Sequence, residues 1–217
     1  MTATAATRAA PALTPIEVYR DDGPLARTLG AALGGAVRVP AIVLAAAGAL
    51  PLLTLLLIEA GSASNGAVGA AIAWLVLVGG ISSGRPHTDS LSWAVVPTIR
   101  LAEYAGVLWL AALAGGSGPA AAFALLSATA FRHYDLVYRL RYQGVPPPRW
   151  VGNLAGGWEG RLLAGWVLLT LDALPAGFFA LGTALGVVFV AESVASWTRL
   201  QRARSVVDYE DEEAEEE

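Results

Sequence analysis

Apolar residues in this 217-residue chain occur in long unbroken runs, and polar residues are concentrated between the runs. A helix needs about 20 apolar residues to cross a bilayer, and several of the runs reach that length. Amphipathic helices of soluble proteins instead repeat their apolar residues every three or four positions. The pattern therefore predicts an all-α fold, a polytopic bundle of helices integral to a membrane.

We expect about six transmembrane helices in a membrane domain that covers residues 16–200. The last apolar run, 160–197, is too long for one crossing, and the sequence "DALPAG" within it is predicted to break it into two. The expected spans lie near residues 39–61, 65–84, 91–116, 119–138, 160–174 and 176–197. A flexible N-terminal lead (1–15) precedes them. An acidic tail (201–217) follows, and its like charges favour disorder.

The distribution of arginine predicts the orientation, since the chain contains no lysine. With the N-terminus in the cytosol, every arginine except the intramembrane Arg100 lies on the cytosolic side. The three outer connections, near 60–65, 115–118 and 172–177, contain no arginine. By the positive-inside rule both termini are cytosolic, and the protein is a multi-pass plasma-membrane protein with an arginine-rich cytosolic face. Four tryptophans near span ends are expected to be interfacial anchors: Trp93, Trp109, Trp158 and Trp197.

Composition narrows the possible chemistry. The chain is 55% hydrophobic and 15% charged, and it has no cysteine and two histidines. A soluble domain carries about a quarter charged residues. Thiolate metal sites, disulfides and cysteine nucleophiles are excluded, and a histidine-rich metal site is not expected. We therefore expect no metal and no cofactor, and membrane lipids rather than nucleic acid as partners.

Arg100 and Glu103 are the first candidate site residues. They lie three positions apart, so they share one face of a helix. Charges at membrane depth are costly and usually face a bundle interior or a wet cavity. Two interpretations stay open: an arginine that binds an anionic headgroup and is held by the glutamate, or a self-sufficient ion pair.

A second candidate group lies in "FRHYDLVYRLR" (131–141). Arg132, Asp135 and Arg139 fall on one helix face at steps of three and four. They form either a solvated row of ion pairs, which stabilises little, or a phosphate site in which Asp135 orients two guanidinium groups. His133 is a candidate base, although a histidine without an identified partner is more often a neutral interfacial residue.

The loop "SGRPHTDSLSW" (83–93) supplies weaker candidates. Arg85, His87 and Asp89 could reach a lipid headgroup from it. The favoured alternative is that Asp89 or Ser90 caps the following helix. The proline- and glycine-rich link 142–161 is expected to be extended and semi-rigid.

The sequence "DDGPLAR" (21–27) shares part of the motif of CDP-alcohol phosphotransferases, which hold divalent metals with four carboxylates. Asp22 and Arg27 fit the first half of that motif. The other three carboxylate positions are occupied by Tyr19, Pro40 and Leu44. One carboxylate cannot build such a site. We therefore expect the two aspartates to cap a short helix at about 24–33 on the cytosolic membrane face, with Arg27 at headgroup level.

Three longer stretches carry a more specific resemblance: "YRDDGPLAR", "FRHYDLVYRLRYQGVPPPRW" and "GGWEGRLL". They resemble an actinobacterial membrane domain of unknown function, over roughly residues 18–200. That domain often lies C-terminal to nucleotidyltransferase and CDP-alcohol phosphotransferase domains. The resemblance implies a role near phospholipid headgroup synthesis, with one of those enzymes as a possible partner.

Three functions follow as hypotheses. The first is an accessory or binding protein in CDP-alcohol-dependent phospholipid or phospho-alcohol synthesis, not an enzyme on its own, in which Arg100, Arg132 and Arg139 contact anionic headgroups. The second is a divergent phosphotransferase, which would use Mg²⁺. It requires four carboxylates to converge: Asp22, Asp89, Glu103 and Asp135. The third is a small transporter or flippase, which requires a polar path through the bilayer.

Overall fold

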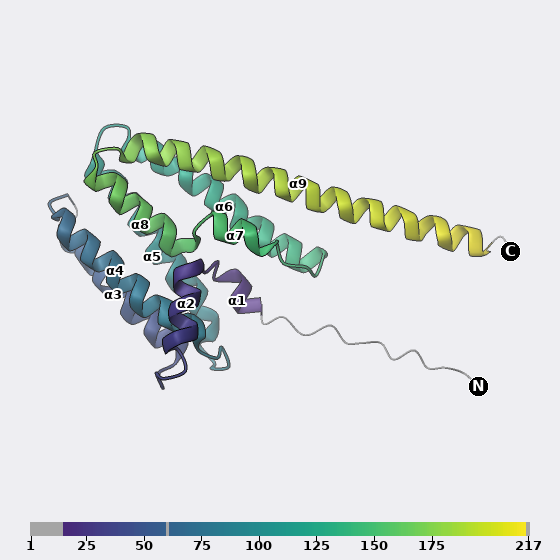
Figure 1. Ribbon diagram of the computed structural model, residues 1–217, viewed down its shortest axis with the longest axis horizontal. Coiled ribbons are helices and arrows are strands. Elements are labelled where there is room, and N and C mark those ends of the chain that lie inside the picture. The colour runs from purple at the N-terminus through teal and green to yellow at the C-terminus, as the bar shows by residue number, and fades with distance from the viewer. Residues whose placement is uncertain (1–14, 60, 216–217) are drawn as a thin grey trace.

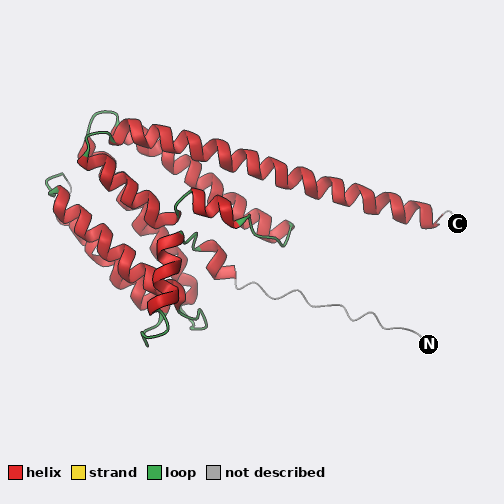
Figure 2. Ribbon diagram, viewed as in Figure 1, coloured by secondary structure: helices red, strands yellow, loops and turns green. Residues whose placement is uncertain are grey.

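The computed structural model describes residues 15–59 and 61–215, and the side chains of 16–59 and 61–202. All secondary structure in this described part is helical (Figure 2), which confirms the all-α prediction. The predicted flexible lead lies outside it, apart from Pro15. The elements are α1 (Pro15–Tyr19), α2 (Pro24–Leu33), α3 (Ala41–Glu59), α4 (Asn65–Ile81), the 3-10 turns η1 (Ser82–Gly84) and η2 (Ser92–Ala94), α5 (Val95–Ala114), α6 (Gly118–Tyr142), α7 (Arg149–Leu154), α8 (Gly157–Thr170) and α9 (Leu174–Glu215).

The long helices form three antiparallel hairpins, α3–α4, α5–α6 and α8–α9 (Figure 1). Helix α5 is central, because it contacts α3, α6, α8 and α9, while α6 packs along α9. The short helix α2 lies across α4 and η1 at the end of the bundle opposite the three hairpin turns (Figure 1). The N-terminal helices therefore cover the end at which α6 and α8 also bring polar residues.

Four helical segments are long and apolar enough to cross a membrane: Ala41–Glu59, Asn65–Gly84, Ser92–Ala114 and Leu174–Arg202. They match four of the six expected spans. The other two expected spans are the helices α6 and α8. Helix α8 has 14 residues, which gives about 21 Å of helix against the roughly 30 Å of a bilayer core. Helix α6 is apolar only as far as Phe131, after which Arg132 begins its charged part.

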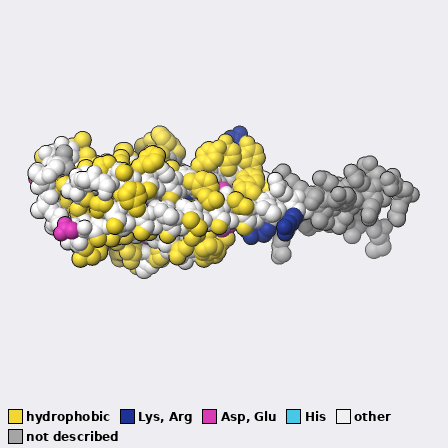
Figure 3. All heavy atoms as spheres, turned by 90° about the horizontal axis from the view of Figure 1, so that it is seen from above, with side chains coloured by type: hydrophobic (Ala, Val, Ile, Leu, Met, Phe, Trp, Pro, Cys, Tyr) yellow, Lys and Arg dark blue, Asp and Glu magenta, His cyan; other side chains and the backbone are white. Residues whose placement is uncertain are grey.

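The outer surface of the bundle is largely hydrophobic. In the apolar windows of α3 and α9 only 28% of residues are buried in the protein. Large apolar side chains such as Leu57, Phe123 and Val187 are exposed, and hydrophobic atoms cover much of the body in the space-filling view (Figure 3). Such a surface suits contact with lipid rather than with water.

Two regions differ from the sequence-based expectations, the link 142–161 and the C-terminal segment. The link 142–161 is not extended throughout, because it contains α7 and the start of α8. Helix α9 continues through residues 201–215, where a disordered tail was expected. Glu, Ala, Arg and Gln, which are strong helix formers, are frequent there. The predicted break in the last apolar run is confirmed: α8 ends at Thr170, and Asp172 adopts a left-handed conformation with φ +53°.

Candidate functional site

The carboxylate of Asp21 lies at the centre of a buried group of charges. It belongs to the turn between α1 and α2, where its φ of +52° is one that aspartate tolerates better than most residues. Its Oδ1 accepts hydrogen bonds from Nε and Nη2 of Arg132 on α6, at 3.0 and 2.9 Å. Its Oδ2 accepts one from Nη2 of Arg161 on α8, at 3.0 Å. One carboxylate thus joins the N-terminal turn to two helices.

Glu103 on α5 extends this group. Its Oε1 accepts a 2.6 Å hydrogen bond from Nε of Arg161, and its Oε2 accepts a 2.7 Å bond from Nη1 of Arg100. The Nη2 of Arg100 donates to the backbone carbonyl of Tyr19, at 2.8 Å. The five charged residues of this chain of contacts are called the ion cluster below: Asp21, Arg100, Glu103, Arg132 and Arg161. It connects four segments that are far apart in the sequence.

The ion cluster carries an excess of positive charge. Three guanidinium groups face two carboxylates, so one positive charge is left without a matching negative charge inside the cluster. Burial alone would raise the pKa of Asp21, but Arg161, with His133 and Arg132, holds that pKa well below its usual range. Asp21 is therefore ionised at neutral pH, and the excess charge is available to an anion.

A second set of contacts joins the start of α2 to the start of α8. Trp158 donates to Oδ1 of Asp22 at 2.8 Å, and Arg20 donates to both oxygens of Asp22. The free backbone N–H groups at the start of α2 donate to the Glu159 carboxylate, from Gly23 at 3.1 Å and from Ala26 at 3.0 Å. The predicted helix over 24–33 is confirmed, but the prediction that an aspartate caps it is wrong. A carboxylate from a distant helix does so instead.

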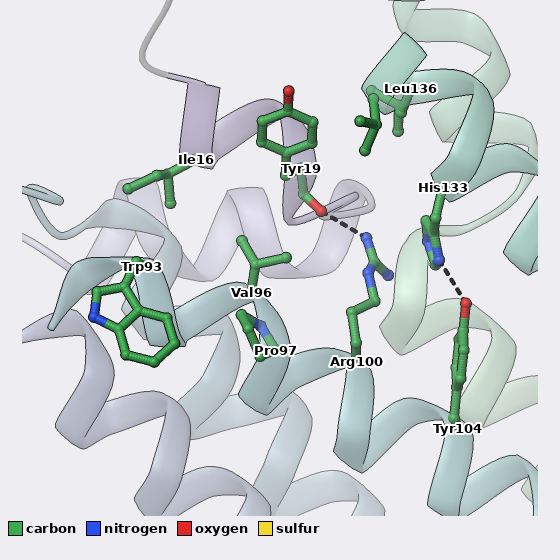
Figure 4. Close-up of a pocket in the computed structure, with 10 residues that line it drawn as sticks. Ile16, Tyr19, Trp93, Val96, Pro97, Arg100, Tyr104, His133 and Leu136 are labelled. Carbon is green, nitrogen blue, oxygen red and sulfur yellow. Dashed lines mark hydrogen bonds between the residues drawn. The ribbon is translucent and has the colours of Figure 1, made fainter.

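A pocket of about 590 Å³ opens beside the ion cluster, between α1, the start of α5 and α6 (Figure 4). Most of its lining is apolar. The polar side chains of Arg100, Tyr104 and His133 lie together on one side of the view, while Ile16 and Trp93 lie on the other. The lining residues are Ile16, Tyr19, Trp93, Val96, Pro97, Arg100, Tyr104, His133, Leu136 and Val137. A volume of this size is typical of small-molecule sites.

Arg100 can bind a further group in this pocket. A guanidinium has five N–H donors. Within the described part of the chain, Glu103 and the Tyr19 carbonyl each take one of them. The side chain of Arg100 is 14% exposed, unlike those of Arg132 and Arg161, which are buried against carboxylates. Of the three arginines in the ion cluster, Arg100 is the one that lines the pocket.

His133 and Tyr104 form a pair at the same end of the pocket. The Tyr104 hydroxyl lies 2.7 Å from Nδ1 of His133, and the two rings stack with centroids 5.9 Å apart. The Nε2 of His133 lies 3.6 Å from Oδ2 of Asp21. His133 thus connects the pocket to the ion cluster.

Comparison with known proteins places the chain in a family. The model described as "Family of unknown function (DUF5941)" matches residues 7–214, which is nearly the whole chain. The chain belongs to the DUF5941 family. No curated protein and no solved structure matches it. The three stretches that carried the resemblance in sequence meet in this DUF5941 member at the ion cluster, through Asp21, Arg132 and Arg161.

The predicted site residues of the DUF5941 chain divide into two places. Arg100, Glu103, Arg132 and His133 lie together at the ion cluster and the pocket. Asp135 and Arg139 lie farther along α6, where Arg139 binds Asp135 at 2.7 Å and Glu192 of α9 at 2.7 Å. The expectation that Asp135 orients both Arg132 and Arg139 is therefore wrong for Arg132, whose partner is Asp21.

The second-tier candidates bind parts of the protein itself. Arg85 donates to the carbonyls of Gly34 and Val39 in the link between α2 and α3. Arg27 binds the side chain of Asn153. Neither η2 nor α5 has a side-chain cap, so the prediction that Asp89 or Ser90 caps the following helix is wrong. These contacts show that Arg27 packs α2 against α7 and that Arg85 packs its loop against the link between α2 and α3.

The carboxylates that a phosphotransferase would need do not form a metal site among the residues that the structure describes. No group of three or more histidine, aspartate or glutamate side chains is placed there to hold a metal ion. Asp22 binds Trp158, Glu103 binds Arg161, and Asp135 binds Arg139. Each of these three carboxylates accepts a hydrogen bond from a different side chain of the protein, and they do not share a common ligand site.

Sequence reasoning missed Arg20, Asp21, Glu159 and Arg161 as site residues. All four belong to the stretches that carried the resemblance, and all four are buried. A charged residue beside a glycine pair, as in "GGWEG", was the available signal, since glycines permit close backbone approach. Trp158, expected at the membrane interface, is instead fully buried, and its indole N–H donates to Asp22.

Proposed function

We propose that this protein is an integral membrane accessory or binding protein that takes an amphiphile with an anionic headgroup into the pocket between α1, α5 and α6. The observation that carries the proposal is the position of Arg100. Its guanidinium has three N–H groups that Glu103 and Tyr19 do not use, and it lies at the polar side of an otherwise apolar pocket. A headgroup oxygen would bind these donors, and an alkyl chain would lie against Val96, Pro97 and Leu136.

The charge of the ion cluster supports an anion over a neutral or cationic headgroup. An unmatched positive charge in a low-dielectric environment is unfavourable, and an anion next to Arg100 would neutralise it. Hydrogen bonds between a guanidinium and a phosphate are charge-assisted and strong. We therefore expect the headgroup of the ligand to carry a negative charge, opposite to the net positive charge of the ion cluster.

We further propose a topology of six passes with both termini in the cytosol, in the plasma membrane. The helices alternate in direction, and none of the three hairpin turns at one end of the bundle contains an arginine. Helices α6 and α8 would cross beside the four apolar segments, with Arg132 of α6 and Arg161 of α8 directed to Asp21 inside the protein. The pocket then lies at the cytosolic headgroup level, where a lipid could enter sideways.

The resemblance to domains found beside nucleotidyltransferases and CDP-alcohol phosphotransferases suggests where such a protein acts. We propose that it serves phospholipid or phospho-alcohol synthesis by binding a lipid substrate or product for one of those enzymes. Co-purification of a tagged copy from its native membrane tests the partnership. A phosphotransferase or nucleotidyltransferase in the eluate supports it, and its absence after mild cross-linking contradicts it.

Ligand binding itself is tested with a defined probe. Titration calorimetry of the purified protein in dodecyl maltoside with dodecyl phosphate measures Kd for the wild type and for Arg100→Gln. Losing a charge-assisted hydrogen bond costs about 1.5–3 kcal/mol, so we expect binding about ten- to a hundredfold weaker in the variant. Arg38→Gln removes an exposed arginine of the α2–α3 link and is expected to bind as the wild type does.

Two outcomes would contradict the proposal. One is that dodecyl phosphate does not bind the wild type. The other is that Arg100→Gln and Arg38→Gln bind it equally well. Arg100→Lys keeps the charge and serves as a second variant if Arg100→Gln does not fold. Its binding is expected to fall between those of the wild type and Arg100→Gln.

A further inference from the structure

His133 is a partly buried residue of α6 whose buried Nε2 atom the ion cluster leaves without a hydrogen bond. Its Nδ1 shares a hydrogen bond with Tyr104, whereas its Nε2 has no hydrogen-bond partner among the described residues and lies 3.6 Å from Oδ2 of Asp21. Both His133 and Tyr104 line the pocket beside Arg100. The pair can therefore respond to whatever binds there.

The charged groups around His133 come from every element that packs near it. Asp21 belongs to the α1–α2 turn, Arg100 and Glu103 to α5, and Arg132 to α6 itself. Arg161 of α8 reaches the same carboxylates. With this ion cluster already carrying one excess positive charge, a protonated His133 would raise the excess to two. The excess positive charge of the cluster therefore favours neutral His133, and a bound dianion would favour the protonated form.

We propose that the pocket selects phosphate monoesters over phosphodiesters, and that His133 takes up one proton from the solvent when such a dianion binds. This inference rests on the proposed binding function and names its ligand class. A phosphodiester carries one negative charge and matches the excess charge of the cluster with neutral His133. A phosphate monoester carries close to two negative charges above its second pKa of about 6. The ion cluster matches this charge only when His133 is protonated as well.

The proton has a defined route within the pair. In the neutral state the Tyr104 hydroxyl donates to Nδ1, and Nε2 carries the ring proton toward Asp21. When a proton is added at Nδ1, this nitrogen becomes the donor to the Tyr104 oxygen, because protonated imidazole has two N–H groups. The Tyr104 hydroxyl hydrogen is then free to bond a phosphate oxygen. Tyr104 thus acts as a positioning residue that transmits the state of His133 to the ligand.

A matched pair of probes tests the selectivity. Dodecyl phosphate and methyl dodecyl phosphate have the same chain and differ in one negative charge. At pH 8, where the monoester is a dianion in solution, we expect it to bind about tenfold tighter than the methyl diester. In His133→Gln and in Tyr104→Phe the two probes should bind within about twofold of each other, because the preference for the dianion depends on this pair. His87→Gln, which changes the other histidine of the chain, should keep the tenfold preference.

The protonation state has its own readout. The chain has two histidines, so ring ¹⁵N spectra of histidine-labelled protein contain few signals, and His133→Gln identifies those of His133. We expect a neutral His133 ring in the free protein at pH 8 and a protonated ring with dodecyl phosphate bound. This measurement on the wild type decides the question even if a His133 variant does not fold.

The possible failures separate the two proposals. If both probes bind the wild type equally and the His133 signals do not change, the selectivity for monoesters is refuted, while binding of an anionic amphiphile stands. If neither probe binds, the proposed binding function itself fails.

Discussion

At the scale of single residues, the arrangement depends most on Asp21. Its two carboxylate oxygens hold Arg132 and Arg161, and both arginines are buried. A buried ion pair contributes little compared with a well-packed apolar pair, but removing one partner leaves a buried charge uncompensated. Asp21 is therefore expected to matter more for stability than its single negative charge suggests.

Replacing Asp21 with asparagine should destabilise the protein by about 3–5 kcal/mol at neutral pH, the cost of breaking a buried ion pair. The pKa of Asp21 is depressed in the folded state. Its contribution is thus fully present above the usual aspartate pKa of about 3.9 and is lost as pH falls through the folded pKa. Unfolding followed by circular dichroism in detergent, from pH 7 to pH 2, measures both effects.

The control for this prediction is Glu17→Gln, which removes an exposed carboxylate from α1. It should leave the free energy of unfolding within about 0.5 kcal/mol of the wild type. The stability gap between the wild type and Asp21→Asn should narrow at the acidic end of the range. A gap that stays constant down to pH 2, or a variant as stable as the wild type at pH 7, would refute the role of Asp21.

Residue-scale contacts were predictable where they are local. The Arg100–Glu103 pair and the Asp135–Arg139 pair follow from spacings of three and four on a helix. The partners of Asp21 could not be predicted in this way, because they lie more than a hundred positions away in the chain. Such contacts depend on how helices pack, and helix periodicity gives no information on that.

At the scale of elements, the decisive contact is between the start of α2 and the start of α8. The backbones approach so closely that a Cβ atom on Gly157 would lie 2.1 Å from the nitrogen of Gly23. Gly157 also has a φ of +65°, a conformation that other residues adopt at a cost. Glycine at 157 therefore allows Glu159 to reach the N–H groups of α2.

Gly157→Ala should lower the free energy of unfolding by about 2 kcal/mol or more, through backbone strain and overpacking. Gly160→Ala is a matched control, since a Cβ atom there would meet nothing within 4 Å. It should be neutral or slightly stabilising, because alanine favours a helix over glycine. Thermal unfolding of both variants side by side measures the difference, and equal stabilities would contradict the close α2–α8 contact.

The sequence was most informative for elements with clear boundaries. Helix α2 begins at Pro24 as expected, because Gly-Pro marks a helix start. Each of the six expected spans coincides with a helix, since apolar runs fold into helices in a membrane, and four of these helical segments are long and apolar enough to cross it. Helix α7 was missed because the prolines and glycines around it indicate an extended link, whereas burial of Val151 and the contact of Asn153 with Arg27 favour a helical turn.

At the scale of the whole molecule, we expect the three hairpin turns to face away from the cytosol and the opposite end of the bundle to face it. The chain has no cysteine, so single cysteines can be introduced without background. Ser62→Cys and Ser117→Cys lie in exposed hairpin turns at one end, and Thr88→Cys lies in the exposed loop at the other. A membrane-impermeant maleimide should label positions 62 and 117 in intact cells, and position 88 only after permeabilisation.

The opposite labelling pattern would invert the orientation and place the pocket on the outer side. If only one of positions 62 and 117 is labelled in intact cells, the six-pass arrangement is contradicted, because the two turns would then lie on opposite sides of the membrane. Total labelling in detergent serves as the control that each cysteine is reactive.

Photolabelling shows whether an anionic amphiphile binds between α1, α5 and α6. An alkyl phosphate with a diazirine in its chain is irradiated with the purified protein, and the labelled peptides are identified by mass spectrometry. We expect labels concentrated on Trp93–Tyr104 and on His133–Val137, competed by excess dodecyl phosphate and strongly reduced in Arg100→Gln. Labels spread over the lipid-facing surfaces of α3 and α9, unchanged in Arg100→Gln, would contradict it.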